Sequence, residues 1–254
     1  YNMLINNQKA FYNHSVNVAL YTKILLNQIK KDYPSCKIND TLEFYIEMAS
    51  LLHDIGKVKV PLYILNKTEP LSYLEFDLIK KHPQLGYIIV ANNFDKLAKT
   101  NEDRKFVEIC KNVILFHHER WDGKGYPDGL KGEEIPISAQ VVSIVDVYDA
   151  LTSERCYKKA YSHEQAMKMI VDGQCGVFNP LLLECLCDIS EEMKASLFEN
   201  ENYADQAVVS KMTDELVIKQ FRSEMPKEKN NESQNRKFFQ EMTFEYDAFK
   251  DAVY

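Results

Sequence analysis

Glycine and proline are scarce in this sequence, with eight of each among 254 residues, and four of the glycines lie between residues 119 and 132. Since these residue types mark turns, their scarcity argues against a fold of many short strands and favours long helices. Long apolar runs are also lacking, so we expect no membrane contact within this chain. The sequence opens at Tyr1 without a leader pattern, and we interpret it as a piece of a longer protein.

An excess of basic residues is lacking as well. Lysine and arginine number 31 against 38 aspartates and glutamates, which gives a formal net charge of −7. Such a chain does not offer the broad basic face that long nucleic acid requires, although local cations can still bind a small anion. The six cysteines form no disulfide framework and no CxxC pair, which predicts a reducing compartment, the cytoplasm.

Apolar residues recur at helical spacing through most of the chain, which predicts an all-α fold. Capping patterns mark several helix starts: Asp40 with Glu43, Ser72 with Glu75, Ser162 with Gln165, and Asn179 with Pro180. The expected helices cover residues 10–31, 40–53, 72–82, 104–118 and 135–153, with further helices from 162 and 179. Residues 119–134 form an irregular segment, and a segment of this length in a helical domain is usually functional.

The same pattern divides the chain into a helical domain at residues 1–200 and a second part at 201–254. We expect the second part to contain a helical extension, a polar linker and an aromatic-rich end from Lys237 to Tyr254. That end is expected to be either the beginning of a following domain or a docking segment.

The placement of histidine carries most of the functional argument. Five of the six histidines and two aspartates stand at the end of a predicted helix or within one: His14, His53, Asp54, His82, His117, His118 and Asp146. Buried imidazoles and carboxylates cost free energy unless they are paired or bind a metal, so this set predicts a dinuclear centre with a bridging carboxylate. His163 stands apart near a helix start, where we expect a surface or capping role.

The donor types narrow the choice of metal. Imidazole with carboxylate and without thiolate suits Fe, Mn, Co, Ni or Zn, and argues against a cysteine-rich structural zinc site. Several ligands per metal, with positions left for water, favour Fe or Mn. Two divalent ions, Fe or Mn, are therefore the expected cofactors.

Several motifs resemble the HD-GYP family of cyclic di-GMP phosphodiesterases, a branch of the HD hydrolase superfamily. HDIGK at residues 53–57 is similar to the HD signature, and HHERWDGKGYPDGL at 117–130 is similar to the segment that names the family. HPQLG at 82–86 and DVYDALTSERCYKKA at 146–160 match it as well, so the resemblance covers about residues 8–200.

The resemblance implies an HD-domain helical bundle with an irregular GYP loop, a metal centre, and hydrolysis of cyclic di-GMP to linear pGpG, with GMP left open as a further product. It assigns His14, His53, Asp54 and Asp146 to one metal, and Asp54, His82, His117 and His118 to the other. Members with three metals carry a glutamate one helical turn before the first histidine, where this chain has Ala10. Two metals are therefore expected.

The hypothetical mechanism uses a hydroxide that bridges the two metals and attacks phosphorus in line, with Asp54 as the bridging ligand. The resemblance implies substrate contacts for Lys57, Arg155 and Lys158. Tyr126 is left open between stacking on a base and packing in the loop.

Three other residues are expected to support the site without touching substrate. Trp121 is expected to pack the loop, and Asp122 to bond its backbone, as aspartate does in tight turns. Asp149 is one helical turn after Asp146 and is expected to orient a ligand or cap a helix.

Three alternatives stay open at this point. One is a binding module that holds cyclic di-GMP or a protein partner, through the GYP loop, without turnover. Another is an HD enzyme for another nucleotide, a hybrid cyclic GMP-AMP dinucleotide above all. The third is an oxygen-using di-iron HD enzyme, although the basic pair Arg155 and Lys158 favours a phosphate substrate. A regulatory domain and a homodimer are also compatible with the sequence.

Overall fold

The computed structural model describes residues 2–154 and 159–204, with side chains from 13 to 197. These residues form helices and no strand, and an isolated β-bridge joins Asp122 to Lys131. The α-helices are α1 (Asn2–Asp32), α2 (Asp40–Ser50), α3 (Leu62–Leu65), α4 (Tyr73–Ile79), α5 (His82–Leu97), α6 (Asn101–Phe116), α7 (Ile137–Thr152), α8 (His163–Val171), α9 (Pro180–Asp188) and α10 (Ser190–Ala204). The 3₁₀ helices are η1 (Pro34–Cys36), η2 (Ile55–Lys59) and η3 (Gly132–Glu134). The predicted all-α class is confirmed, and none of the described helices combines the length and the apolarity that a membrane crossing requires.

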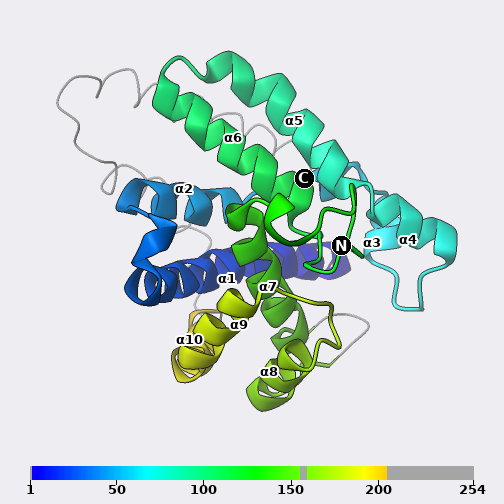
Figure 1. The fold of residues 1–254 in the computed structure, drawn as a ribbon. Coiled ribbons are helices and arrows are strands. Elements are labelled where there is room, and N and C mark those ends of the chain that lie inside the picture. Colours follow the sequence, from blue (N-terminus) through cyan, green and yellow to red (C-terminus); the bar gives the residue numbers. More distant parts are fainter. Residues whose placement is uncertain (1, 155–158, 205–254) are drawn as a thin grey trace.

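The core lies where α1, α2, α6 and α7 pack against one another, with α5 alongside α6 (Figure 1). α7 is buried along most of its length, and its Val141, Val142, Ile144 and Val145 have no exposed surface. Valine and isoleucine are weak helix formers, so burial against the neighbouring helices keeps this segment helical. The site residues carried by α1 and α7 are therefore held by the packed core of the described residues.

Local capping decides where several helices begin. The Ser72 hydroxyl accepts a hydrogen bond from the Glu75 backbone N–H, and the Glu75 carboxylate accepts one from the Ser72 backbone N–H. Ser162 and Gln165 repeat this arrangement before α8, and Asn179 caps α9 with Pro180 in the first turn. All three predicted helix starts are confirmed.

The predictions for α2 and α4 need correction. The N-cap of α2 is Asn39 rather than Asp40, because the Asn39 side chain accepts the Leu42 N–H at 2.8 Å. Asparagine and aspartate cap about equally well, so the sequence alone could not separate the two. The helix expected to reach His82 ends at Ile79, and α5 begins afresh at His82.

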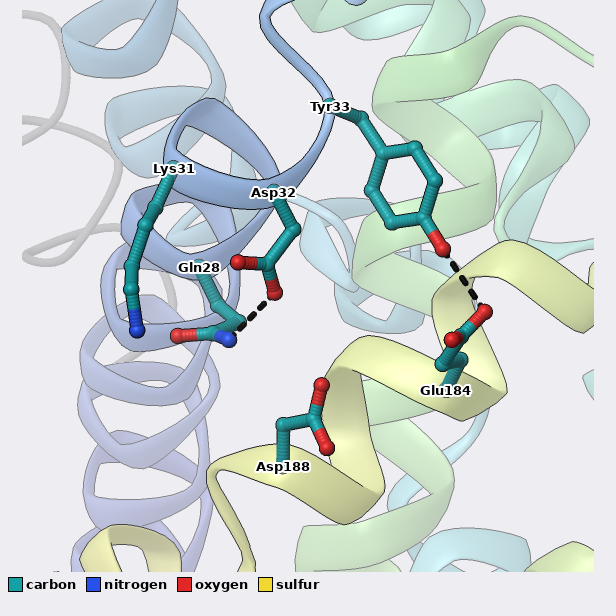
Figure 2. Close-up of a pocket in the computed structure, with 6 residues that line it drawn as sticks. All are labelled: Gln28, Lys31, Asp32, Tyr33, Glu184 and Asp188. Atoms are coloured by element: carbon teal, nitrogen blue, oxygen red, sulfur yellow. Dashed lines mark hydrogen bonds between the residues drawn. The ribbon is translucent and has the colours of Figure 1, made fainter.

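A shallow groove lies between the end of α1 and α9, and Figure 2 shows the polar side chains that line it: Gln28, Lys31, Asp32, Tyr33, Glu184 and Asp188. The Tyr33 hydroxyl crosses it and donates to Glu184 at 2.6 Å. None of these residues belongs to the predicted metal centre, so the groove is separate from the chemistry considered below.

Candidate metal centre

The seven predicted metal ligands come together as two groups of side chains. His14, His53 and Asp146 form the first group, and Asp54, His82, His117 and His118 form the second. Within each group the potential ligand atoms all lie within 4.8 Å of one another. His118 is half-buried and the other six are buried. The described residues thus bring together the whole predicted ligand set, and each residue's role stays a prediction.

The first group depends on the packing of α1 against α7. His14 in α1 places its Nε2 atom 3.2 Å from Oδ1 of Asp146 in α7, and 3.2 Å from Nε2 of His53. On its other side His14 donates from Nδ1 to Asp149 Oδ2 at 2.6 Å. Asp149 in turn accepts from the Asn17 amide at 2.8 Å. Asp149 therefore orients the ring of His14, and its role behind a metal ligand stays a prediction.

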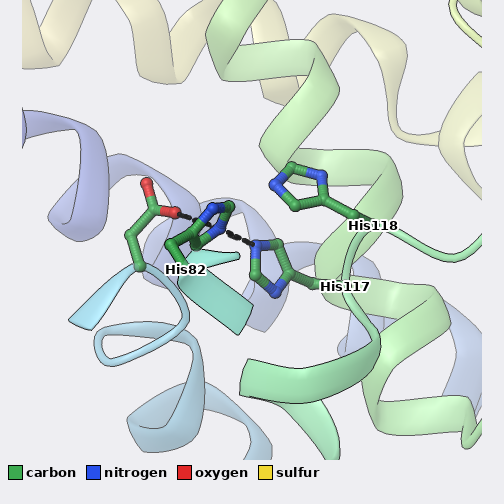
Figure 3. A group of neighbouring side chains, drawn as sticks. His82, His117 and His118 are labelled. Atoms are coloured by element: carbon green, nitrogen blue, oxygen red, sulfur yellow. Dashed lines mark hydrogen bonds and ion pairs between the residues drawn. The ribbon is translucent and has the colours of Figure 1, made fainter. Parts of the chain in front are cut away.

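The second group forms where the start of α5 meets the end of α6. Figure 3 shows His82, His117 and His118 with their rings turned toward a common space. The Nε2 atoms of His82 and His117 lie 3.3 Å apart, and the ring centroids of His82 and His118 are 5.0 Å apart. Gly56 permits this approach, since a Cβ atom there would lie 1.9 Å from the His82 carbonyl oxygen.

Asp54 lies between the two groups and faces both. Its Oδ2 atom is 3.4 Å from His53 Nε2 and 3.6 Å from His14 Nε2. Its Oδ1 atom is 3.2 Å from His82 Nε2 and 3.8 Å from His117 Nε2. One carboxylate with an oxygen toward each group has the placement that a bridging ligand requires.

Three of the histidines make the same local hydrogen bond to the backbone. The Nδ1 atom of His53 donates to the Ser50 carbonyl, that of His82 to Ile79, and that of His117 to Ile114, at 2.7, 2.7 and 2.9 Å: in each case the residue three positions earlier. A carbonyl can only accept, so the proton is on Nδ1 and, in the neutral ring, Nε2 carries a lone pair. These carbonyls belong to the last turns of α2, α4 and α6, where the helix itself supplies no donor.

The lone pairs of the second group indicate whether a metal ion fits there. Burial, together with His53 and His82, lowers the pKa of His117 to about 3, so its ring is neutral at physiological pH. The lone pair of His117 then faces that of His82 and the Oδ1 atom of Asp54, which is buried without a hydrogen-bond partner. With both imidazoles in the neutral form, the two rings and the carboxylate present three acceptors to one another, and a cation among them would stabilise this arrangement. The second group therefore fits a metal ion.

The first group also favours a cation. Burial opposes a charge on His14, but Asp146 and Asp149 outweigh it and raise the pKa of His14 well above its usual value. Burial likewise opposes ionisation of Asp54, yet Lys57 and His53 hold its pKa well below its usual value. The carboxylates are thus charged, and they attract a positive charge to the space they share with the imidazoles.

The loop of residues 119–132 covers one side of the second group. The Tyr126 ring stacks on His118 with centroids 4.7 Å apart. The ammonium of Lys80, which follows the last residue of α4, lies 5.2 Å from the centroid of the Tyr126 ring. Lys57 bonds Asp54 Oδ2 and is half-buried. Lys57 and Tyr126 therefore border the metal centre, whereas their contact with substrate stays a prediction.

Other residues of this loop keep it in place. Glu119 accepts the backbone N–H groups of Asp128 and Gly129 at 2.7 and 3.0 Å, and Asp122 accepts that of Lys124 at 3.2 Å. A Cβ atom at Gly125 would come within 2.4 Å of the Glu119 backbone, so only glycine fits there. The predicted role of Asp122 is confirmed, and Glu119 is a supporting residue that the sequence did not single out.

Two of the predicted substrate contacts lie outside the described residues. Arg155 and Lys158 fall in the gap between residues 154 and 159. Arg120 is a cation that sequence reasoning missed: it lies 5.2 Å from the Phe178 ring centroid, and its Nη1 atom is buried without a hydrogen-bond partner. Its position in the motif beside His118 was the signal that could have identified it.

The prediction for His163 is wrong. This side chain is only 7% exposed, although it begins α8. Its Nδ1 atom lies 2.8 Å from the Tyr148 hydroxyl and its Nε2 atom lies 2.9 Å from the Ser190 hydroxyl. His163 is therefore a buried histidine with a partner on each nitrogen, rather than a surface or capping residue.

Comparison with known proteins agrees with this geometry. A family model described as an HD domain matches residues 2–178. A cyclic di-GMP phosphodiesterase of Vibrio cholerae is 40% identical over 154 residues, which are 59% of this chain and 30% of that protein. A 3′3′-cGAMP-specific phosphodiesterase of the same organism is 36% identical over 150 residues, which are 59% of this chain and 27% of that protein. The chain thus spans less than a third of the length of either relative.

A solved structure shares the fold. An HDG"Y"P protein from Bdellovibrio bacteriovorus aligns with a TM-score of 0.53 and 24% identity, over 72% of this chain and 53% of that chain. At this identity the likeness concerns the helical architecture alone.

Proposed function

The chain belongs to the HD domain family, and on this premise we propose that it is a metal-dependent phosphodiesterase that hydrolyses cyclic di-GMP to linear pGpG. The observation that carries the proposal is Asp54, whose two oxygens each face one group of histidines. Such a carboxylate suits a two-metal hydrolase. The relatives named cyclic di-GMP phosphodiesterases support the choice of substrate.

The donor set suits two divalent ions, of which we propose Fe or Mn. His14, His53, Asp146 and Asp54 would hold one ion, and Asp54, His82, His117 and His118 would hold the other. Bound there, the ions would supply Lewis-acid chemistry that lowers the pKa of a water molecule and neutralises charge on a phosphate.

The chain's own residues would bind and orient the substrate. Lys57 stands beside Asp54, where its ammonium can donate to a non-bridging phosphate oxygen. Tyr126 offers its half-buried ring beside His118 to a guanine base. Arg155 and Lys158 stay predicted phosphate contacts. In the reaction a water molecule loses a proton and its oxygen bonds to phosphorus, the bond from phosphorus to the ribose 3′ oxygen breaks, and that oxygen takes up a proton in place of the one that the water lost.

The test is anaerobic turnover of cyclic di-GMP by chain loaded with Fe(II) or Mn(II), with products resolved by chromatography and metal counted in the same sample. We expect pGpG at about two metals per chain. Metal-free chain prepared in parallel is the control and is expected to give no product. Bound metal without product would favour the binding module.

A second candidate substrate is 3′3′-cGAMP, because a relative 36% identical to this chain is specific for it. The same metal-loaded sample should be given both dinucleotides in competition. We expect the ratio of kcat/KM values to favour cyclic di-GMP, and a ratio in favour of the hybrid dinucleotide would reassign the substrate.

Three further predictions accompany the enzymatic one. We propose that a protein partner binds the loop of residues 119–132. We also propose a homodimer, which sedimentation would detect. We propose the cytoplasm as the compartment, because the five described cysteines are free thiols, which suits a reducing environment.

A further inference from the structure

An exposed apolar surface lies on α3 and α4, outside the metal centre. We call it the α3–α4 surface and define it by Leu62, Tyr63, Tyr73, Leu74 and Phe76. These five are among the seven most exposed large apolar side chains of the described residues, and Tyr73, Leu74 and Tyr63 are 83%, 74% and 70% exposed. Single exposed apolar residues are ordinary, but a cluster of them marks an interaction surface.

α4 itself packs only weakly against the other described residues. None of its seven residues is buried, and a helix of this length is not stable by itself in water. The capping box and the ion pair of Lys67 with Glu75, at 2.6 Å, hold its first turn. These polar contacts leave the apolar face uncovered at the edge of the molecule (Figure 1). Burial of that face would stabilise α4.

We propose that residues 237–254 of the same chain cover the α3–α4 surface. Within this segment Phe239, Met242, Tyr246, Phe249 and Val253 follow one another at alternating spacings of three and four residues. This spacing predicts an amphipathic helix with one apolar stripe. The segment lies outside the described residues, so the argument uses its sequence, and a stripe of large side chains suits an apolar surface rich in tyrosine and leucine.

Charge favours this pairing over other parts of the molecule. Residues 237–254 carry four acidic side chains and two lysines, which gives a net charge of −2. Residues 57–88, which include α3 and α4, carry five lysines and three acidic side chains, which gives +2. The whole chain has a net charge of −7, so a stretch with a positive net charge is a favourable place for an acidic segment.

The length of the intervening chain permits the contact. Residues 205–236 separate α10 from the segment, and these 32 residues can extend over roughly 110 Å. A domain of about 200 residues has a radius of gyration of about 16 Å. The segment can therefore reach the α3–α4 surface from the end of α10.

Hydrogen exchange on the full chain tests the proposal with a matched pair of variants. Phe249 lies on the apolar stripe, whereas Phe244 lies on the opposite side of the same helical pattern. We expect Phe249→Asp to accelerate amide exchange in residues 62–79 on the order of tenfold, as loss of a central interface aromatic does. Phe244→Asp should leave that exchange unchanged. No acceleration in Phe249→Asp, or equal acceleration in both variants, would overturn the proposal.

A photo-crosslink identifies the occupant directly. A benzophenone amino acid in place of Tyr73, in full chain mixed from ¹⁴N and ¹⁵N preparations, should crosslink to residues 237–254 of the same isotope. Crosslinks to the α3–α4 surface of another copy would show self-association instead, and the proposal would be wrong. Crosslinks to added phosphatidylglycerol vesicles, or none at all, would equally contradict it.

Discussion

The buried histidines fall in two regions that differ in one respect. His163, between α7, α8 and α10, has a hydroxyl partner on each ring nitrogen. Three histidines of the metal centre, His53, His82 and His117, have a carbonyl partner on Nδ1, and their Nε2 atoms face other imidazoles and carboxylates. A hydroxyl can donate or accept, so His163 is satisfied as it stands. The difference teaches that burial alone does not identify a ligand histidine, whereas a lone pair that faces other acceptors does.

The largest expected effect comes from removing two side chains of the metal centre. We expect His53→Ala combined with Asp54→Ala to abolish metal binding and to lower turnover by on the order of 10³-fold or more, because the bridging carboxylate is lost. Metal content by elemental analysis and turnover of cyclic di-GMP measure the two effects. His163→Ala is the matched control, and activity retained in the double variant would defeat the two-metal mechanism.

His163→Ala should affect stability and leave metal content unchanged. The substitution removes a buried ring and leaves the Tyr148 and Ser190 hydroxyls without their partner, which is expected to lower the free energy of unfolding by roughly 2–3 kcal/mol. Urea denaturation of metal-loaded chain measures the change. A loss of bound metal in the folded variant would mean that the two regions are coupled, and the comparison would fail.

The substitution Asp149→Asn tests the hydrogen bond that orients the ring of His14. Asparagine has one acceptor oxygen where aspartate has two, so it cannot accept from both the His14 Nδ1–H and the Asn17 amide. The orientation of the His14 ring therefore weakens, and metal affinity is expected to fall about 10–100-fold. Metal titration with a competing chelator provides the affinity. Asp172→Asn, which removes an exposed carboxylate paired with Lys168, is the control for a change of charge alone. Equal affinities in the two variants would exclude the supporting role.

The smallest expected effect is the pH dependence of stability that comes from the ion pair of Glu164 with Lys194. The side-chain hydrogen bond from Lys194 lowers the pKa of Glu164 from 4.5 to about 2. A depressed folded pKa means that this pair stabilises the fold above about pH 4.5 and that the contribution disappears as pH falls through about 2. The unfolding midpoint of the wild type should thus exceed that of Glu164→Gln slightly at pH 6, and the two should converge toward pH 2. A gap that stays constant over this range would assign the difference to another cause.

The sequence predicted what short-range chemistry determines. Capping pairs such as Ser72 with Glu75 act within one helical turn, so their outcome can be read from neighbouring residues. Most of the candidate ligands could be named from the sequence because they lie in recognisable motifs: His53 in HDIGK, His82 in HPQLG, and His117 with His118 in the segment 117–130. Burial of His163 was not predictable, because its partners stand 15 and 27 residues away and only the packing of α7, α8 and α10 brings them together. The end of α4 at Ile79 lies three residues before the predicted end at His82, because lysines at 80 and 81 do not interrupt a helical pattern.

The Asn39 cap and the Lys80 position illustrate two further limits. Asn39 and Asp40 are adjacent and chemically equivalent as caps, so only the backbone conformation chooses between them. Lys80 covers Tyr126, which is 46 residues further along the chain, and no local pattern announces such a contact.

The bond from a histidine Nδ1 to the carbonyl three residues earlier has a consequence for how the site can be altered or borrowed. In the tetrapeptides that end in His53, His82 and His117, one hydrogen bond gives a partner to a carbonyl at the end of a helix and places the ring proton on Nδ1. The four residues thus contain both the acceptor and the histidine whose tautomer it determines. Grafted onto the last turn of another helix, such a tetrapeptide is expected to hold the proton on Nδ1 and leave the lone pair on Nε2 of the neutral ring.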